Sequence, residues 1–186
     1  MTPAFSARFK QIFRIFFLLL GLGFFPAVAQ TAFAPRYSNQ VANGDITIIG
    51  NVNYHCSTNA PATTTQINNC SLVRAGNTTI PNTQVYIEPI DTDNDATTTN
   101  SSSALLTLPT GSSVLFAGLY WSGNSTSTTN QSRVTLATPT NSAATSITAT
   151  TSNIMTISPT LYQSFADVTS LIQAGGNGTY TVGNIA

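Results

Sequence analysis

The sequence VLFAGLYW, residues 114–121, has apolar side chains on both faces of an extended chain. A strand that is apolar on both faces is typical of a sheet interior covered by other layers on each side. The run therefore predicts a central strand. Gly118, in its middle, predicts that a neighbouring backbone or ring approaches closely at that point.

Further strand-like segments flank this run, each of them short and separated from the next by Gly, Pro or Asn. Regularly spaced short strands with such turns are typical of a sandwich or a barrel. The sequence thus predicts an all-β fold, an antiparallel β-sandwich of the jelly-roll type, with residues 122–132 as an exposed loop. The segments are 45–51, 84–90, 104–109, 133–137, 146–150, 153–157, 162–166 and 178–185.

One short helix is expected near the C-terminus, in the sequence FADVTSLIQAGG (165–176). Asp167 can accept hydrogen bonds from the free N–H groups of the first turn, and Val168, Leu171 and Ile172 share one face. Gly175 and Gly176 supply the left-handed stop. At about two turns the helix must pack on the sheet to be stable.

The first 29 residues have the pattern of a secretory signal peptide. A positively charged start is followed by the apolar run IFFLLLGLGFF (15–25) and by the small residues of AVA (27–29). The apolar run is short for a membrane span. We therefore expect cleavage after Ala29 and one exported domain over 30–186, the uncleaved membrane anchor being the alternative.

Charge excludes two classes of partner for residues 30–186. This part has three arginines, six carboxylates and no lysine, for a net charge of −3. Nucleic-acid binding needs a cationic stripe that displaces counterions from phosphates, and a surface-bound membrane helix needs a basic face. Neither pattern is present, so no nucleic-acid partner and no membrane insertion after signal cleavage are expected.

Cys56 and Cys70 are the two cysteines of the chain. In an exported protein an even cysteine count favours a disulfide, here Cys56–Cys70. His55 precedes Cys56, which raises the alternative of a Cys–His metal site. Because the chain has one histidine and no zinc-like spacing, the disulfide is the prediction.

Acidic residues gather in DTDNDATTTNSSSA (91–104). Asp91, Asp93 and Asp95 alternate with polar residues, as at the start of a calcium loop. Ala96 stands where such a loop needs glycine, however, and Ser102 stands where it needs a bidentate glutamate. The prediction is an exposed connection between the segments 84–90 and 104–109, with calcium as a weakly bound cofactor at most.

No catalytic pattern in the sequence is complete. His55 is the only histidine for a Ser–His–Asp triad and has no nucleophile-elbow motif. Glu88 and Asp91 are the remaining candidates for a glycosidase pair. The expectation is a protein that is not an enzyme and has no catalytic residues.

Aromatic residues give the second candidate site. Trp121, Tyr120 and Tyr54 could stack on sugar rings, which would make Trp121 and Tyr120 ligand-binding residues. A Trp that ends a central strand more often belongs to the core, and the core is the favoured position for Trp121.

Three longer stretches carry a family resemblance: FAPRYSNQVANGDITIIGN (33–51), SSSALLTLPTGSSVLFAGLYWSG (101–123) and YQSFADVTSLIQAGGNGTYTVGNI (162–185). They resemble the N-terminal β-domain of large bacterial secreted or cell-surface proteins that carry tandem conserved-repeat domains of unknown function. The resemblance implies a secreted or cell-surface, adhesin-like domain, with no catalytic residues to transfer. Because similar proteins continue beyond this point, it also implies that the domain is truncated at Ala186.

The function expected on these grounds is a non-catalytic exported module, structural or adhesive, at the N-terminus of a larger bacterial surface protein. Its partners would be the downstream repeat domains of the same chain, and glycans or host and cell-surface proteins. A carbohydrate-binding module is the alternative, followed by a secreted hydrolase.

Overall fold

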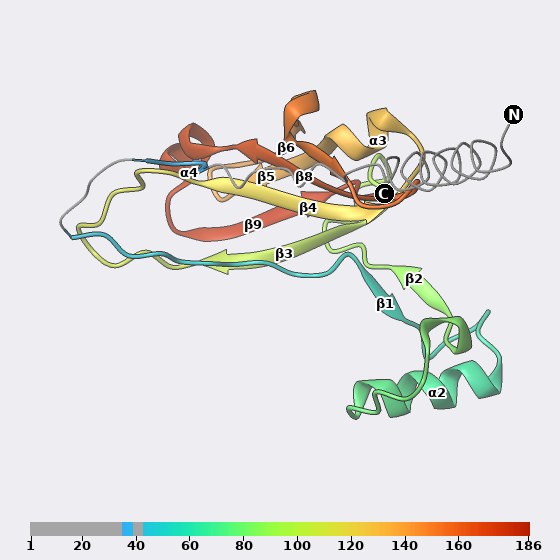
Figure 1. Ribbon diagram of the computed structural model, residues 1–186. Coiled ribbons are helices and arrows are strands. Elements are labelled where there is room, and N and C mark those ends of the chain that lie inside the picture. Colours follow the sequence, from blue (N-terminus) through green and yellow to red (C-terminus); the bar gives the residue numbers. More distant parts are fainter. Residues whose placement is uncertain (1–34, 39–42) are drawn as a thin grey trace, which may run out of the picture. The chain divides into compact units, whose positions relative to one another are not determined.

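Short strands in two antiparallel sheets make up most of the regular structure in the computed structural model, which describes residues 35–38 and 43–186. The chain divides into two units, 1–40 and 41–186, and the fold is that of the second. Within it, the described strands form a four-stranded sheet in the order β3-β9-β5-β6 and a three-stranded sheet in the order β4-β8-β7 (Figure 1). The all-β, sandwich-like prediction is confirmed. The predicted signal peptide lies outside the described residues.

The four-stranded sheet consists of β3 (Ser101–Leu106), β9 (Gly178–Gly183), β5 (Arg133–Thr138) and β6 (Asn141–Thr148). The three-stranded sheet consists of β4 (Gly118–Asn124), β8 (Leu161–Asp167) and β7 (Ile154–Thr156). A separate two-stranded ribbon pairs β1 (Tyr54–Cys56) with β2 (Ile87–Pro89). The helices are α2 (Thr64–Arg74), α3 (Thr128–Ser132) and α4 (Thr169–Gly175), with 3₁₀ turns η1 (Asn82–Gln84) and η2 (Thr151–Asn153).

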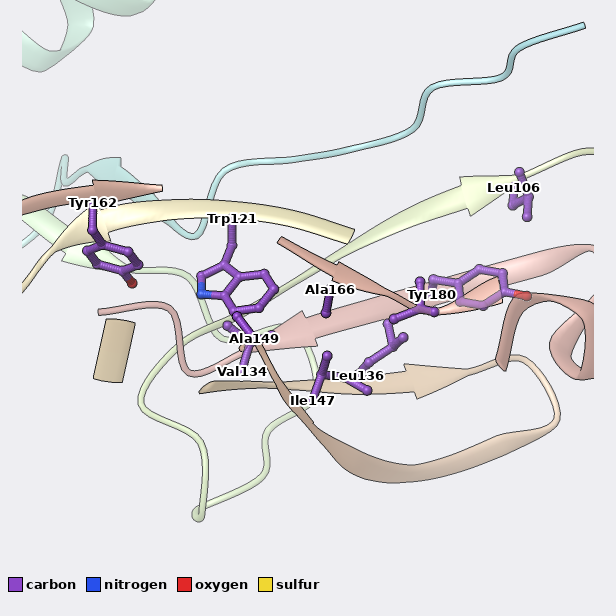
Figure 2. Close-up of a cluster of buried hydrophobic side chains, with 10 residues drawn as sticks. Leu106, Trp121, Val134, Leu136, Ile147, Ala149, Tyr162, Ala166 and Tyr180 are labelled. Atoms are coloured by element: carbon purple, nitrogen blue, oxygen red, sulfur yellow. The ribbon is translucent and has the colours of Figure 1, made fainter. Parts of the chain in front are cut away.

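Side chains from both sheets meet in one hydrophobic core (Figure 2). Alternate residues of each strand point inward, as the pleat requires. Three large aromatic side chains anchor the core: Trp121 from β4, Tyr162 from β8 and Tyr180 from β9. Smaller residues fill the space between them: Leu106, Val134, Leu136, Ile147, Ala149, Ala166 and Val168.

The prediction of a central strand at 114–121 is wrong. The strand β4 begins only at Gly118, and it pairs with β8 alone among the described strands. The central strand of this sheet is β8, which pairs with β4 on one side and β7 on the other. Tyr120 points outward with 52% of its surface exposed, whereas the adjacent Trp121 is buried. The apolar run is therefore divided between a loop and a strand with one covered face.

Gly118 confirms the expected close approach. A Cβ atom there would lie 2.7 Å from the Phe165 ring and 3.2 Å from the Tyr120 ring. Glycine leaves room for both rings beside the backbone.

The predicted strand at 45–51 is also absent. This stretch has no strand assignment, and Ile46 and Ile48 are 83% and 89% exposed. A hydrogen bond joins it to β3, from Asn51 Nδ2 to the carbonyl oxygen of Ser103 at 3.2 Å. A β-prone sequence alone does not make a strand, because the ladder needs a partner whose backbone groups are in register.

The helix near the C-terminus is confirmed as α4. Asp167 precedes its N-cap, Val168, and accepts hydrogen bonds from the Thr169 N–H and hydroxyl at 2.9 and 2.6 Å. Of the two glycines, Gly176 takes the positive φ of +63°. No helix among the described residues has the length and apolar character needed to cross a bilayer.

The prediction of one helix is wrong because the chain also forms α2 and α3. Helix α2 begins with a capping box, in which the Thr63 side chain accepts from the Gln66 N–H and Gln66 accepts from the Thr63 N–H. The pair satisfies two N–H groups that the first turn leaves open. In the stretch 122–132, expected to be a loop, β4 ends and α3 forms.

Candidate functional site

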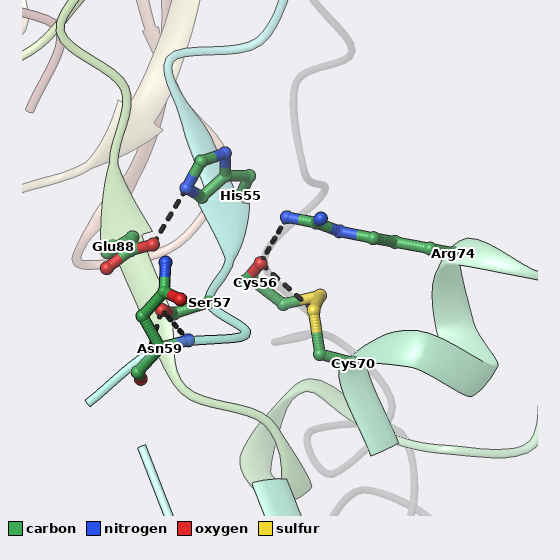
Figure 3. Close-up of polar contacts among 7 residues, drawn as sticks. All are labelled: His55, Cys56, Ser57, Asn59, Cys70, Arg74 and Glu88. Atoms are coloured by element: carbon green, nitrogen blue, oxygen red, sulfur yellow. Dashed lines mark hydrogen bonds and ion pairs between the residues drawn. A yellow bond between two sulfur atoms is a disulfide. The ribbon is translucent and has the colours of Figure 1, made fainter. Parts of the chain in front are cut away.

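Residues 53–90 form a small lobe, defined by the β1–β2 ribbon, helix α2 and the turn η1. Its own core consists of Cys56, Cys70 and Val85, with Val73 and Ile80 packed against them. The predicted disulfide is confirmed: Cys56 and Cys70 are bonded, with their Cα atoms 5.6 Å apart. It links α2 to β1, and the Arg74 guanidinium donates to the Cys56 carbonyl oxygen at 2.7 Å (Figure 3).

His55 and Glu88 face each other across the ribbon, with Nε2 and Oε1 2.9 Å apart (Figure 3). Hydrogen bonds from Ser57 and then from His55 lower the pKa of Glu88. Glu88 thus lies between Ser57 and His55. In a Ser–His–Asp triad the histidine lies between the serine and the acid, because the histidine must take the proton from the serine hydroxyl. Ser57 is fully buried, with its hydroxyl bonded to Asn59. This order of side chains binds β1 to β2 and leaves no activated hydroxyl.

Three carboxyl groups of the chain make the stability dependent on acid. Hydrogen bonds lower the pKa of Glu88, and bonds from Thr169 lower that of Asp167. Burial alone would raise the pKa of Asp93. Hydrogen bonds from Ser101, the Asp95 N–H and Thr98 outweigh this effect, so the pKa of Asp93 is lowered overall. A carboxyl group whose pKa is lower in the folded state stabilises the fold fully at pH values above its unfolded pKa. That stabilisation is lost as the pH falls through the folded-state pKa. The unfolded pKa values are 4.5 for Glu88 and 3.8 for Asp93 and Asp167.

We therefore expect the urea midpoint to fall as the pH is lowered below about 4.5, since the unfolded state then binds more protons than the folded one. Urea titrations between pH 7 and pH 3 measure this. Glu88→Gln and Asp167→Asn should each make the acid-induced fall shallower. A midpoint that stays constant down to pH 3 would contradict the assigned hydrogen bonds.

The acidic residues lie in an exposed connection between β2 and β3, as predicted, and the three aspartates are exposed. The last part of the stretch 91–104 is no loop, however, because β3 begins at Ser101, three residues earlier than expected. The aspartate oxygens accept hydrogen bonds from within the loop and from the start of β3. Asp91 accepts from the Asn94 N–H at 2.9 Å, Asp93 from the Ser101 hydroxyl at 2.9 Å, and Asp95 from the Thr97 N–H at 2.9 Å. Each carboxylate therefore stabilises a turn. Among the residues that the structure describes, no group of three or more acidic, histidine or cysteine side chains is arranged to hold a metal ion.

Calcium binding at Asp91, Asp93 and Asp95 stays a prediction, with a dissociation constant in the millimolar range. An ion would have to compete with the internal hydrogen bonds of the loop and lacks a bidentate glutamate. Calorimetry should show weak heats that vanish in the Asp91/Asp93/Asp95→Asn triple variant. Submicromolar binding that this variant abolishes would instead mean a dedicated calcium site.

The assignment of Trp121 as a ligand-binding residue is wrong. The indole is 4% exposed, packs in the core and donates its Nε1–H to the Gln131 carbonyl oxygen at 3.1 Å. Because successive residues of a strand point to opposite faces, Tyr120 lies on the outer face instead. Its ring centroid is 4.8 Å from that of Phe165. Tyr54 belongs to a different group, so the three aromatics form no common platform.

Asn100, which the sequence did not single out, organises a buried polar cluster where β3 begins. Its Oδ1 accepts from Asn53 Nδ2 at 2.7 Å and from the Ile185 N–H at 3.0 Å. Its Nδ2 donates to the Tyr54 hydroxyl at 3.0 Å and to the Ile185 carbonyl oxygen at 2.7 Å. One fully buried amide thus connects the start of the lobe, the four-stranded sheet and residues 184–186. An Asn within a run of Thr and Ser gives no sequence signal of this role.

Replacing Asn100 by Asp should lower the free energy of unfolding by about 2 kcal/mol, because a carboxylate cannot donate to Tyr54 or Ile185 and is itself buried. Chemical denaturation measures the loss. Asn130→Asp is the matched control: it makes the same chemical change on exposed helix α3 and should shift stability by less than about 0.5 kcal/mol. Equal effects of the two substitutions would contradict the role of the cluster.

Comparison with known proteins adds no relative. A scan against protein-family models finds no match, and searches of curated proteins and of solved structures give no significant match. The resemblance to N-terminal domains of bacterial surface proteins therefore rests on the three sequence stretches alone.

Proposed function

We propose that residues 30–186 form a non-catalytic exported module, structural or adhesive, at the N-terminus of a larger bacterial surface protein. The disulfide carries the proposal. Structural disulfides persist in secreted and cell-surface proteins, whereas the reducing cytosol opens them. The Cys56–Cys70 disulfide is buried in the core of the lobe. Such burial is typical of a structural disulfide, whereas a disulfide that takes part in redox chemistry has to be accessible.

The placement of the charged side chains supports a role without catalysis. Glu88 joins β1 to β2, Asp93 joins its loop to β3, and Asp167 accepts hydrogen bonds from Thr169 at the start of α4. These acids have hydrogen-bond partners that lower their pKa values, whereas a general acid at neutral pH needs a raised one. Most of the remaining exposed polar groups are hydroxyls and amides.

The lobe provides the surface that an adhesive role would use. Helix α2 exposes Thr64, Thr65, Asn68 and Ser71 together with Leu72, which is 49% exposed. Hydroxyl and amide groups around one apolar side chain suit glycans or the surfaces of host and cell-surface proteins. The disulfide would hold this face in place and so lower the ordering cost of binding.

Carbohydrate binding is the second candidate, and the observation that favours it is the exposed ring of Tyr120. The ring lies against Phe165 on the outer face of the three-stranded sheet, where a sugar could stack. A glycan array on the wild type and on Tyr120→Ala tests it. Saturable micromolar binding lost in that variant would favour this candidate over a structural or adhesive module.

Labelling of intact cells tests the leading proposal. An antibody raised against residues 43–186 should label cells that produce the full protein before permeabilisation, in the same amount as after it. An antibody against a cytoplasmic protein is the control for cell integrity. Signal seen only after permeabilisation would refute a surface module. Turnover of a substrate that Glu88→Gln abolishes would instead favour the secreted hydrolase.

A further inference from the structure

Two Asn–Gly pairs occur in the chain, Asn43–Gly44 and Asn177–Gly178. An asparagine side chain can react with the nitrogen of the next residue, and glycine favours this because it has no Cβ atom to shield that nitrogen. The reaction requires the amide carbon of the asparagine to approach the glycine nitrogen in one particular geometry. How firmly the structure holds each pair therefore decides whether the pair reacts.

The pair Asn177–Gly178 is held on both sides of the bond that would form. Asn177 Oδ1 accepts from the Leu108 N–H at 2.6 Å, and Asn177 Nδ2 donates to the Leu108 carbonyl oxygen at 3.3 Å. Gly178 is the first residue of β9, with a φ of +138°, and a Cβ atom there would lie 2.7 Å from the Pro139 side chain. The amide carbon is thus fixed by hydrogen bonds of its own amide group, and the glycine nitrogen is fixed in a strand.

The pair Asn43–Gly44 lies in a different setting. Asn43 forms a bend, Gly44 is in irregular structure, and both residues are exposed. The stretch that follows is not packed either, since Ile46 and Ile48 are 83% and 89% exposed. Asn177 is exposed as well, so access to water does not distinguish the two pairs. The difference between them is how far the main chain and the amide can rearrange without breaking the fold.

We infer that Asn43 is a site of spontaneous deamidation in the folded protein and that the fold protects Asn177 from the same reaction. A base removes the proton of the Gly44 N–H, and the nitrogen forms a bond to Asn43 Cγ. The bond from Cγ to Nδ2 breaks, and Nδ2 takes up a proton and leaves as ammonia, which closes a succinimide ring. Water then opens the ring at either carbonyl carbon and leaves an aspartate or an isoaspartate.

The product differs from the original domain in charge. Each deamidated molecule carries one further carboxylate, close in the sequence to Asp45, on a domain that already has a net charge of −3. Isoaspartate also adds a methylene group to the main chain. Because Asn43 lies outside the helices and strands, this change should leave the urea midpoint unaltered. The domain would therefore exist in two charge forms with one fold, whatever partner it binds.

Peptide mapping of the folded protein, incubated in mildly alkaline buffer, tests the inference. Trypsin places Asn43 in peptide 37–74 and Asn177 in peptide 134–186. Deamidation replaces an NH group by oxygen, and fragmentation of each peptide locates this change of mass. Asn43 should react at least about tenfold faster than Asn177, because Asn177 must first break its two hydrogen bonds. Equal rates at the two residues, or an Asn43 that stays intact, would overturn the inference.

Unfolding in urea supplies the control for the role of the fold. The two pairs should then react at similar rates, because neither is held. If Asn177 stayed slower than Asn43 in the unfolded chain, the local sequence would explain the difference and the inferred protection would be wrong.

Gly44→Val supplies the control for the chemistry. Its branched side chain would shield the attacking nitrogen and should slow the reaction at Asn43 in the folded protein. Gly50→Val makes the same change at a position with open space around it and should leave the rate at Asn43 unchanged. A Gly44→Val protein that deamidates at Asn43 as fast as the wild type would contradict the proposed ring closure.

Discussion

Trp121→Ala is expected to lower the free energy of unfolding by about 3–5 kcal/mol, the cost of deleting a large aromatic side chain from a core. The indole is 4% exposed and lies between the two sheets, where collapse of the surrounding residues would be limited. Its loss also leaves the Gln131 carbonyl oxygen with one donor fewer, although the Ser164 hydroxyl still donates to it at 2.6 Å. Urea denaturation measures the change.

Tyr120→Ala is the control from the adjacent position of the same strand. Tyr120 is 52% exposed, so its truncation should cost about 1 kcal/mol or less. The contrast between neighbours tests which face of β4 is covered. If Tyr120→Ala cost as much as Trp121→Ala, the assigned orientation of the strand would be wrong.

The Cys56→Ala/Cys70→Ala double variant is expected to lose about 3 kcal/mol of stability, the loop-closure value for a bridge spanning about fifteen residues. The loss should be concentrated in the lobe, because the disulfide belongs to the lobe core and not to the core between the sheets. Amides of α2 should therefore exchange faster, while those of β5 and β9 change less.

Arg74→Ala separates the disulfide from its neighbouring hydrogen bond. It removes the bond to the Cys56 carbonyl oxygen and keeps the bridge, so it should cost about 1 kcal/mol. A double cysteine variant that is no less stable than the wild type would show that the bridge does not contribute to the fold.

Much of the fold follows from sequence patterns that depend on neighbours within a few residues. The strands at 133–138, 154–156, 161–167 and 178–183 match short β-branched or alternating segments, and α4 matches its cap and stop signals. The Thr63–Gln66 capping box, with Gln three residues after Thr, is a sequence signal for the start of α2.

What the sequence could not predict depends on partners far away in the chain. Whether 114–121 is central or peripheral depends on which strands pair with it, and apolar character cannot decide this. The exposure of Ile46 and Ile48 likewise depends on the absence of a ladder with β3, not on the side chains themselves. Hydropathy also cannot distinguish Trp121 in the core from Trp121 on a binding face, because both positions favour aromatic rings.

The candidate site was less predictable than the fold. The disulfide followed from cysteine count and compartment, but the contact of Glu88 with His55 depends on the register of β1 and β2. Asn100 and Ile185 are brought together by hydrogen bonds although they lie 85 positions apart in the sequence. Pairings of this kind need the three-dimensional structure.

The central claim is that this domain is exported and folds around a disulfide, and one mass-spectrometric measurement tests both parts. The protein is purified from its source without reductant and digested with trypsin, which cuts after Arg36 and Arg74. The prediction is an N-terminal peptide that begins at Gln30, and a peptide 37–74 that is lighter by the two hydrogens lost when Cys56 and Cys70 join. A peptide that begins at Met1, together with two free thiols in 37–74, would contradict the account.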